Sequence, residues 1–286
     1  MTRQKLIAEA FIGACRDELR APKPGNVHDF SPGHRMTATQ FIQSADAAVG
    51  PLCAPQVRVG ARILGAVEAT VSTVGANTNL GIILLCAPLA AAAELTPSGL
   101  RDAVASVLAN LDVADASDAF AAIVRACPAG LGRTNENDVF EPAKVTLLQA
   151  MCEAADRDSV ARQYATGFSD VFDFGVAVNA NALKRWDDVK WATLAVYLAF
   201  LSEIPDSHIV RKHGADVGTA VRRKAVEVNA QFWAALDPVE LLHDLLSWDA
   251  TLKATGINPG TSADLTVATL FAYRLQSILQ SAHNSD

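Results

Sequence analysis

The run LGIILLCAPLAAAA at residues 80–93 contains no charged side chain and is apolar almost throughout. A helix needs about 20 such residues to cross a bilayer, so this run is too short to do so. Pro88 falls within it, which also disfavours a regular membrane helix. We therefore expect no contact with a membrane and interpret residues 80–93 as the buried central helix of the fold.

The remainder of the chain shows helical patterns in place of strand patterns. Half of the 286 residues are apolar and only 6% are aromatic, a balance typical of closely packed Ala- and Leu-rich helices. Apolar residues recur at helical spacing, as at Ile7, Phe11 and Ala14, and no stretch alternates long enough to require a strand. We predict an all-α bundle of roughly a dozen helices in a single domain, residues 1–286.

Capping signals predict where several helices begin and end. We expect one helix to begin near Thr37, another at Pro55, and the last one at Thr261 or Ser262, which would cap it. Gly256 is expected to end the helix before it. The segment 128–142 is the longest expected loop and a candidate lid over a site.

Charge and cysteine usage exclude several classes of protein. The formal net charge of −7 offers no basic face to a nucleic-acid backbone. The five cysteines form no C-x-x-C pair, and the first residues contain no long apolar leader. We expect a cytoplasmic protein with reduced thiols and small-molecule substrates, and no nucleic-acid partner. The composition leaves room for a homodimer packed through helices.

Polar, glycine-containing segments interrupt the helical pattern at four places, each at an expected helix end. They are PKPGNVH at 22–28, GANTN at 75–79, DSHIVRKHG at 206–214 and NPGTSAD at 258–264. Unpaired backbone N–H groups at the start of a helix attract anions. Each segment taken alone is also an ordinary turn or helix cap, so the interpretation depends on the side chains that they carry.

These side chains suit a phosphorylated ligand that is bound with a metal ion. The basic residues that can neutralise phosphate are Lys23, Arg211 and Lys212. The carboxylates that can bind Mg²⁺ are Glu68, Asp206 and Asp264. Three histidines share these segments and are further candidates: His28, His208 and His213. The other three are interpreted as surface or packing residues: His34, His243 and His283.

Glu68 stands apart from the four segments. It falls in an apolar helical stretch between Ile63 and Val71. A buried carboxylate without a partner is costly, so we favour a metal or ligand role for Glu68 over a role in bonding a helix end. We expect four charged side chains to converge in one pocket: Lys23, Glu68, Asp206 and Asp264.

The order of the motifs resembles the triphosphoribosyl-dephospho-CoA synthase family over nearly the whole chain. KPGNVH at 23–28 comes first, then Phe-x-x-Ser-Ala at 41–45, GANT at 75–78, the segment that starts at Asp206, and NPGTSADL at 258–265. The first and last motifs keep this order across more than two hundred residues, which is hard to meet by chance. The family supplies the prosthetic-group precursor of citrate lyase and malonate decarboxylase.

The resemblance implies an all-α transferase whose substrates are ATP, with Mg²⁺, and 3′-dephospho-CoA. The 2′-hydroxyl of dephospho-CoA attacks C1′ of the ATP ribose, adenine leaves, and the triphosphate stays on the transferred ribose. The expected catalytic residues, as metal ligand or base, are Glu68 and Asp264. The residues expected to bind substrate are Lys23, Asn26, His28, Asn77, Thr78, His208, Arg211, Lys212, His213 and Ser262.

The chain departs from the better-known members of this family in the second motif, where Asn79 and Leu80 replace a His and a Lys. Residues 157–168 resemble a divergent branch found in organisms that use methanopterin- or methanofuran-type cofactors. Three alternatives stay open. They are ribosyl or phosphoryl transfer to a precursor of such a cofactor, hydrolysis of a nucleotide with Mg²⁺, and nucleotide binding without catalysis.

Overall fold

Helices form nearly all of the regular structure. The computed structural model describes residues 2–95, 99–128, 132 and 137–283, and no strand occurs in these ranges. The all-α prediction is confirmed. A π-helical turn at Asp170–Gly175 precedes α9, and a 3₁₀ turn at Pro238–Leu241 precedes α13. The helices are α1 (Arg3–Arg20), α2 (Ala38–Leu52), α3 (Val59–Val74), α4 (Leu80–Ala92), α5 (Leu100–Ala109), α6 (Val113–Ala126), α7 (Leu147–Ala154), α8 (Ser159–Ala165), α9 (Val176–Trp186), α10 (Val189–Glu203), α11 (Ser207–His213), α12 (Ala215–Ala234), α13 (Leu242–Ala254) and α14 (Gly260–His283).

Helix α4 is the buried central helix that its sequence predicts. Every side chain from Ile82 to Ala90 is buried, because α2, α3, α5 and α14 all pack against it. A helix that is apolar all round must be surrounded in this way. The helix continues through Pro88, so the proline does not end it. None of the helices in the described ranges is long and apolar enough to cross a membrane.

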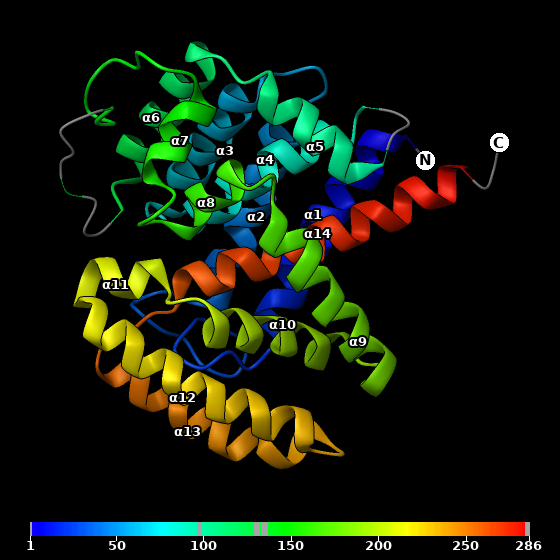
Figure 1. The fold of residues 1–286 in the computed structure, drawn as a ribbon, viewed down its shortest axis with the longest axis vertical. Coiled ribbons are helices and arrows are strands. Elements are labelled where there is room, and N and C mark those ends of the chain that lie inside the picture. The colour runs from blue at the N-terminus through cyan, green and yellow to red at the C-terminus, as the bar shows by residue number, and fades with distance from the viewer. Residues whose placement is uncertain (1, 96–98, 129–131, 133–136, 284–286) are drawn as a thin grey trace.

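Two hydrophobic clusters fill the interior, and each contains a helix that is buried all round. The first surrounds α4 and includes α1–α8; the second surrounds α10, whose side chains from Trp191 to Ser202 are all buried. Figure 1 shows α1–α8 above and α11–α13 below, with α14 crossing between them. Because α14 packs on α1, α4 and α10, it belongs to both groups.

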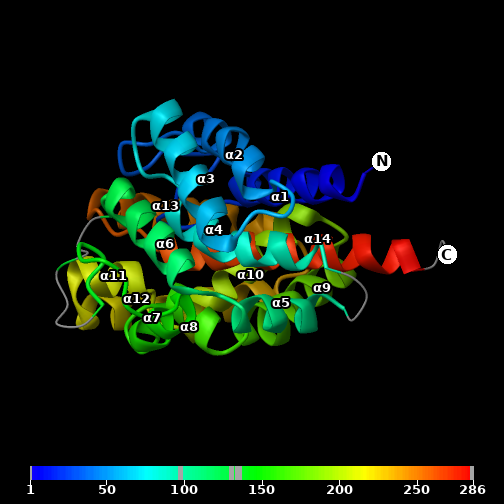
Figure 2. The same ribbon diagram turned by 90° about the horizontal axis from the view of Figure 1, so that it is seen from above.

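The ends of helices bring the polar segments close to one another. Gly75 ends α3 in the left-handed region, with φ of 71°, and turns the chain into the segment before α4. Asp206 caps α11, and α14 begins at Gly260. In the view from above, α1 and α4 lie beside α14, and α11 lies near the first residues of α14 (Figure 2).

Four of the predicted helix ends can be compared with the structure, and Gly256, with φ of 72°, follows the end of α13 as predicted. Thr37 caps α2 as predicted, through a capping box with Gln40. The third helix begins at Val59 and not at Pro55, which lies in the preceding turn. The last helix begins at Gly260, so Ser262 lies inside its first turn. The candidate lid at 128–142 includes residues 129–131 and 133–136, which lie outside the described residues.

Candidate active site

A cavity of about 830 Å³ is bordered by the starts of α4, α11 and α14 and by α6, α7 and α8. This volume is typical of a pocket for small molecules. Part of its wall is apolar and is formed by Phe120, Ile123, Leu147 and Met151. Polar and charged side chains from the loops at residues 26–36 and 76–79 form much of the remainder.

Seven of the predicted site residues line this cavity, and each of the four polar segments contributes at least one. They are Asn26, Asn77, Thr78, His208, Arg211, Lys212 and Asp264. The Thr78 hydroxyl donates to Ser44 Oγ at 2.6 Å, and the side-chain oxygen of Asn77 accepts from the backbone N–H of Leu80 at 3.2 Å. The segments therefore meet at one cavity, and the binding roles of these residues stay predictions.

Asp264 places a carboxylate at the start of α4. Its side chain packs so closely on Gly81 that a Cβ at that position would overlap the carboxylate. No side chain in the described ranges forms a hydrogen bond or ion pair with it. Burial raises the pKa of Asp264 well above its usual range, and the carboxylates of Asp206 and Glu18 raise it further. A carboxylate in this position is a candidate for ligand binding.

Glu18 and Lys23 form a buried ion pair beside the cavity. Oε1 of Glu18 lies 2.5 Å from Nζ of Lys23, which also donates to Asn26 Oδ1 at 3.1 Å and to the Val27 carbonyl at 2.6 Å. An ammonium group has three hydrogens, so Lys23 has none left for a phosphate. Lys23 does not line the cavity either. The predicted phosphate-binding role of Lys23 is corrected: it holds Glu18 and its own loop.

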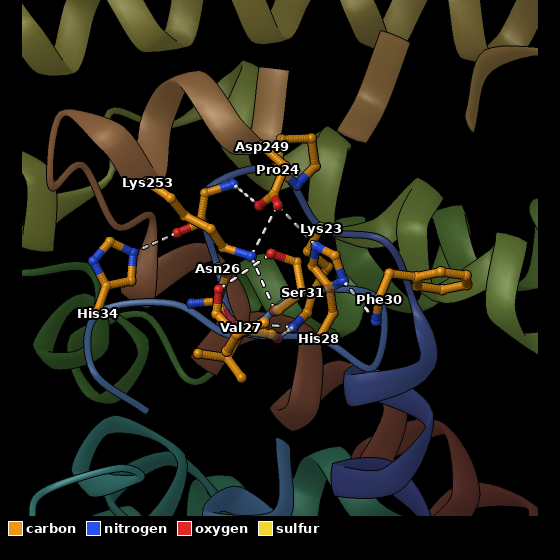
Figure 3. A network of polar contacts seen from close by, with 12 residues as sticks. Lys23, Pro24, Asn26, Val27, His28, Phe30, Ser31, His34, Asp249 and Lys253 are labelled. Carbon is orange, nitrogen blue, oxygen red and sulfur yellow. Dashed lines mark hydrogen bonds and ion pairs between the residues drawn. The ribbon is translucent and has the colours of Figure 1, made fainter. Parts of the chain in front are cut away.

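Asp249 of α13 fixes the loop that follows α1 (Figure 3). Its Oδ1 accepts the backbone N–H of Gly25 at 2.8 Å, and its Oδ2 lies 3.4 Å from His28 Nε2 and 2.9 Å from Lys253 Nζ. Gly25 has φ of 83°, a conformation that favours glycine. His28 is buried and faces Asp249 instead of the cavity, which corrects its predicted role in substrate binding.

The same loop carries His34 and Arg35 to the cavity wall. Both residues lie in the left-handed region, with φ of 53° and 64°, a strained conformation that often marks functional sites. Nε2 of His34 lies 2.7 Å from the Gly25 carbonyl. The two backbone polar groups of Gly25 are therefore both bound, the N–H by Asp249 and the carbonyl by His34. His34 is thus part of the cavity wall, in contrast to its interpretation as a surface or packing residue.

Basic side chains from three segments line the cavity: Arg35, Arg157, Arg211 and Lys212. Nη1 of Arg211 lies 3.3 Å from Oδ2 of Asp158, whose side chain is also on the wall. His208 lies among these groups. Burial and then the positive charges of Arg211 and Lys212 lower its pKa to about 4, so its imidazole is neutral at pH 7. This set of cations can bind an anion with several phosphates.

Asp206, Ser262 and His213 connect helices and do not line the cavity. Oδ2 of Asp206 accepts from the backbone N–H of Ser262 at 2.7 Å and from its hydroxyl at 2.9 Å. Oδ1 accepts from the N–H of Ile209 at 3.1 Å, so Asp206 joins the starts of α11 and α14. Nε2 of His213 lies 3.1 Å from the Gly256 carbonyl. These contacts correct the predicted metal role of Asp206 and the substrate roles of the other two.

Glu68 is exposed on α3 and lies outside the cavity wall. The prediction that it is buried is wrong, because the buried face of α3 runs through Ile63, Ala66, Val67 and Thr70, and Glu68 lies off that face. Its catalytic and metal roles are wrong for the same reason. Within the described residues, no three His, Cys, Asp or Glu side chains are placed to hold a metal ion together. The predicted ligand set of Glu68, Asp206 and Asp264 is therefore not formed.

Our sequence reasoning missed Glu18, Arg35 and Arg157. Glu18 gives a signal, because it follows Phe11 and Ala14 at helical spacing on the buried face of α1. A charged residue on an apolar face indicates a buried partner or a site. Arg35 and Arg157 give no comparable signal, since only the folded chain brings them beside α11 and α14.

Comparisons with known proteins identify the family and a similar fold. A family model described as ATP:dephospho-CoA triphosphoribosyl transferase matches residues 4–283. The fold is similar to the crystal structure of an Archaeoglobus fulgidus protein that is provisionally named triphosphoribosyl-dephospho-CoA synthase. The two share a TM-score of 0.63 and 21% sequence identity over 80% of this chain and 96% of that one. No curated protein matches the sequence.

Proposed function

Since the chain belongs to the ATP:dephospho-CoA triphosphoribosyl transferase family, we propose that the cavity at the starts of α4, α11 and α14 is the active site of this transfer. The enzyme moves the triphosphoribosyl group of ATP to the 2′-hydroxyl of 3′-dephospho-CoA and releases adenine. One observation carries the assignment of the site: the carboxylate of Asp264, which has no partner among the described residues, shares a cavity with Arg35, Arg157, Arg211 and Lys212.

The cations are suited to the triphosphate of ATP. A guanidinium group donates two parallel hydrogen bonds to phosphate oxygens, so three arginines can fix the direction of a triphosphate as well as neutralise it. Arg211 is the best placed of them, because it lies on α11, next to the start of α14 that carries Asp264. His208 adds a neutral imidazole, which can bond to a sugar hydroxyl without adding charge.

Asp264 is suited to the ribose. Transfer at C1′ passes through an oxocarbenium-like state that carries positive charge on the sugar. A carboxylate held in place before the reaction stabilises such charge at little reorganisation cost. Among the described residues it has no hydrogen-bond or ion-pair partner, so a ligand can take up this interaction. Burial makes the charged form of Asp264 costly, and a positively charged ligand would lower that cost.

Mg²⁺ fits this site as a companion of ATP. The ion usually keeps several waters and takes only one or two carboxylates besides substrate phosphates. A cage of three protein ligands is therefore not required, and Asp264 is the side chain that we propose as its protein ligand. Bound there, Mg²⁺ would neutralise phosphate charge near the ribose.

The family match favours transfer over the hydrolytic and non-catalytic alternatives. A scaffold has no need for a half-buried carboxylate that finds no partner among the described residues, because such a group costs stability. The replacement of a His and a Lys by Asn79 and Leu80 removes charge from the start of α4, and both residues line the cavity. Asp264 thus faces a neutral part of the wall at that point.

Product analysis by mass spectrometry tests the proposed function. The purified chain is incubated with ATP and Mg²⁺, with and without 3′-dephospho-CoA. We expect free adenine and a dephospho-CoA that is heavier by one triphosphoribosyl group, only when both substrates are present. Adenine or phosphate released at the same rate without the acceptor would indicate a hydrolase, and no product in either mixture would contradict the proposed activity.

A further inference from the structure

Glu18 is a buried acidic residue, and its charged form needs a partner inside the fold. Its side chain lies in the last turn of α1 and is 3% exposed, yet it reaches the wall of the 830 Å³ cavity. It also borders a second, much smaller cavity of about 10 Å³, together with Asn79 and Ile82 of the α4 start. Glu18 therefore lies between the end of α1 and the start of α4.

Lys23 holds one oxygen of this carboxylate and leaves the other available. Nζ of Lys23 contacts Oε1 of Glu18 at 2.5 Å, while Asn26 and Val27 occupy its other two hydrogens. No other described residue donates a hydrogen bond to Glu18. Because Lys23 is fully buried and tied at three points, the carboxylate has a fixed direction. Its second oxygen has no donor among the described residues, and the side chain reaches the cavity wall.

Glu18 and Asp264 approach the start of α4 from different helices. Asp264 packs on Gly81, and Glu18 lies beside Asn79 and Ile82. Glu18 contributes to the raised pKa of Asp264, after burial and Asp206. Within the part of the chain that the structure describes, Glu18 pairs with a cation and Asp264 does not. Two carboxylates in unlike environments at one site are the usual arrangement when one stabilises charge and the other moves a proton.

We infer that Glu18 is a catalytic residue that accepts the proton of the attacking hydroxyl, with Lys23 as the residue that positions it. This inference rests on the proposed function. The hydroxyl oxygen forms a bond to C1′ of the ribose and gives its proton to Glu18. The bond between C1′ and the adenine nitrogen breaks, and adenine takes that electron pair. Adenine gains one proton on leaving, which balances the one that the hydroxyl loses.

A purely structural role for Glu18 is the competing explanation. In that case the carboxylate only neutralises Lys23, and its loss would harm the enzyme by leaving a buried ammonium without a partner. Removal of one member of a buried ion pair is strongly destabilising, whereas replacement of both members by neutral groups is often tolerated. The two explanations therefore differ in what the double replacement does to activity.

The test compares Glu18→Gln, Lys23→Met and the double variant Glu18→Gln/Lys23→Met with the wild type. We expect Glu18→Gln to lower kcat by at least about 100-fold, the usual contribution of a positioned base, with little change in the KM for ATP. We expect the double variant to recover thermal stability and to keep the low kcat. Glu94→Gln is the matched control. Oε1 of Glu94 lies 2.8 Å from Nη2 of the buried Arg62, and neither residue lines the cavity. It should lower stability and leave kcat unchanged.

Each outcome separates the inference from the proposed function. A double variant that regains both stability and kcat would show that Glu18 serves only Lys23, and would overturn the inference alone. A kcat within a few-fold of the wild type for Glu18→Gln would do the same. A wild-type enzyme that forms no triphosphoribosyl product would overturn the proposed function, and this inference with it.

Discussion

Individual residues at the cavity differ mainly in what surrounds them. Glu18 has a lysine partner, Asp264 has none in the described ranges, and His208 lies among cations that keep its ring neutral. Side chains of the same type therefore have different properties in this site. Burial is the largest cause of the pKa shift of each group, and the neighbouring charges modify that shift.

The lowered pKa of His208 predicts how stability depends on pH. The unfolded His208 binds a proton below about pH 6.5, while the folded one does so only below about pH 4. Between these values the unfolded state binds more protons, so a fall in pH favours unfolding. We expect the wild type to lose on the order of 2 kcal/mol relative to His208→Gln across this window.

Urea unfolding of both proteins at pH 7, 5.5 and 4 measures this difference. The comparison cancels the contributions of His28 and His34, whose pKa values burial also lowers. Unfolding free energies that change in parallel in the two proteins would show that His208 does not titrate differently on folding.

The sequence was sufficient to predict some site residues and insufficient for others. Asp264 and Arg211 fall in motifs that interrupt the helical pattern, and both line the cavity. Glu68 misled us because its neighbours are apolar, although the helical register places it off the buried face. Lys23 and Asp206 lie in the right motifs but bond to the protein itself, and only the folded structure shows which partner a charged group finds.

At the scale of single elements, α4 and its neighbours were the most predictable. The residues of α4 are apolar on every side, which predicts a buried helix. Thr37 has a hydroxyl that can cap a helix, which predicts the start of α2. The start of α14 was less predictable. Ser262 has the chemistry of a cap, but Asp206 from α11 binds both its backbone and its hydroxyl, and the helix starts two residues earlier.

The close contact between α4 and α14 predicts the effect of Gly81→Ala. The added methyl group would overlap the Asp264 carboxylate and force it to move. We expect kcat to fall on the order of 100-fold, the effect of a small misplacement of a catalytic group. Thermal stability should be retained, since alanine favours a helix more than glycine does.

Gly50→Ala is the matched control for this variant. Gly50 also lies in a helix, α2, and an added Cβ there meets no atom within 4 Å. Both variants would be assayed for adenine release and for thermal unfolding. Equal kcat values for the two variants would argue against a catalytic position for the Asp264 carboxylate.

At the scale of the whole molecule, the cavity draws on both groups of helices. α4, α6, α7 and α8 belong to the first group and α11 to the second, while α14 packs against both. A ligand in this position contacts elements that are otherwise connected mainly through α14. Association into a homodimer and the single-domain organisation stay predictions at this scale.

We therefore expect ATP to stabilise the entire chain. At 100 times its Kd, a ligand that binds only the folded state contributes about 2.7 kcal/mol, which scanning calorimetry would detect as a higher unfolding temperature. Arg211→Met should reduce this increase, whereas Arg223→Met, an exposed change on α12, should not. An increase of the same size in both variants would contradict the assignment of Arg211 to the triphosphate.

The packing of α14 on α1 also determines when this enzyme can become active during its synthesis. The ring of Phe11 contacts that of Phe271, and Asp17 pairs with Arg274, so α1 can complete its packing only after α14 has been synthesised. Until α14 emerges, the apolar face of α1 needs protection from aggregation. Since Asp264 belongs to the same helix, the wall of the cavity is incomplete in a nascent chain until α14 has been synthesised.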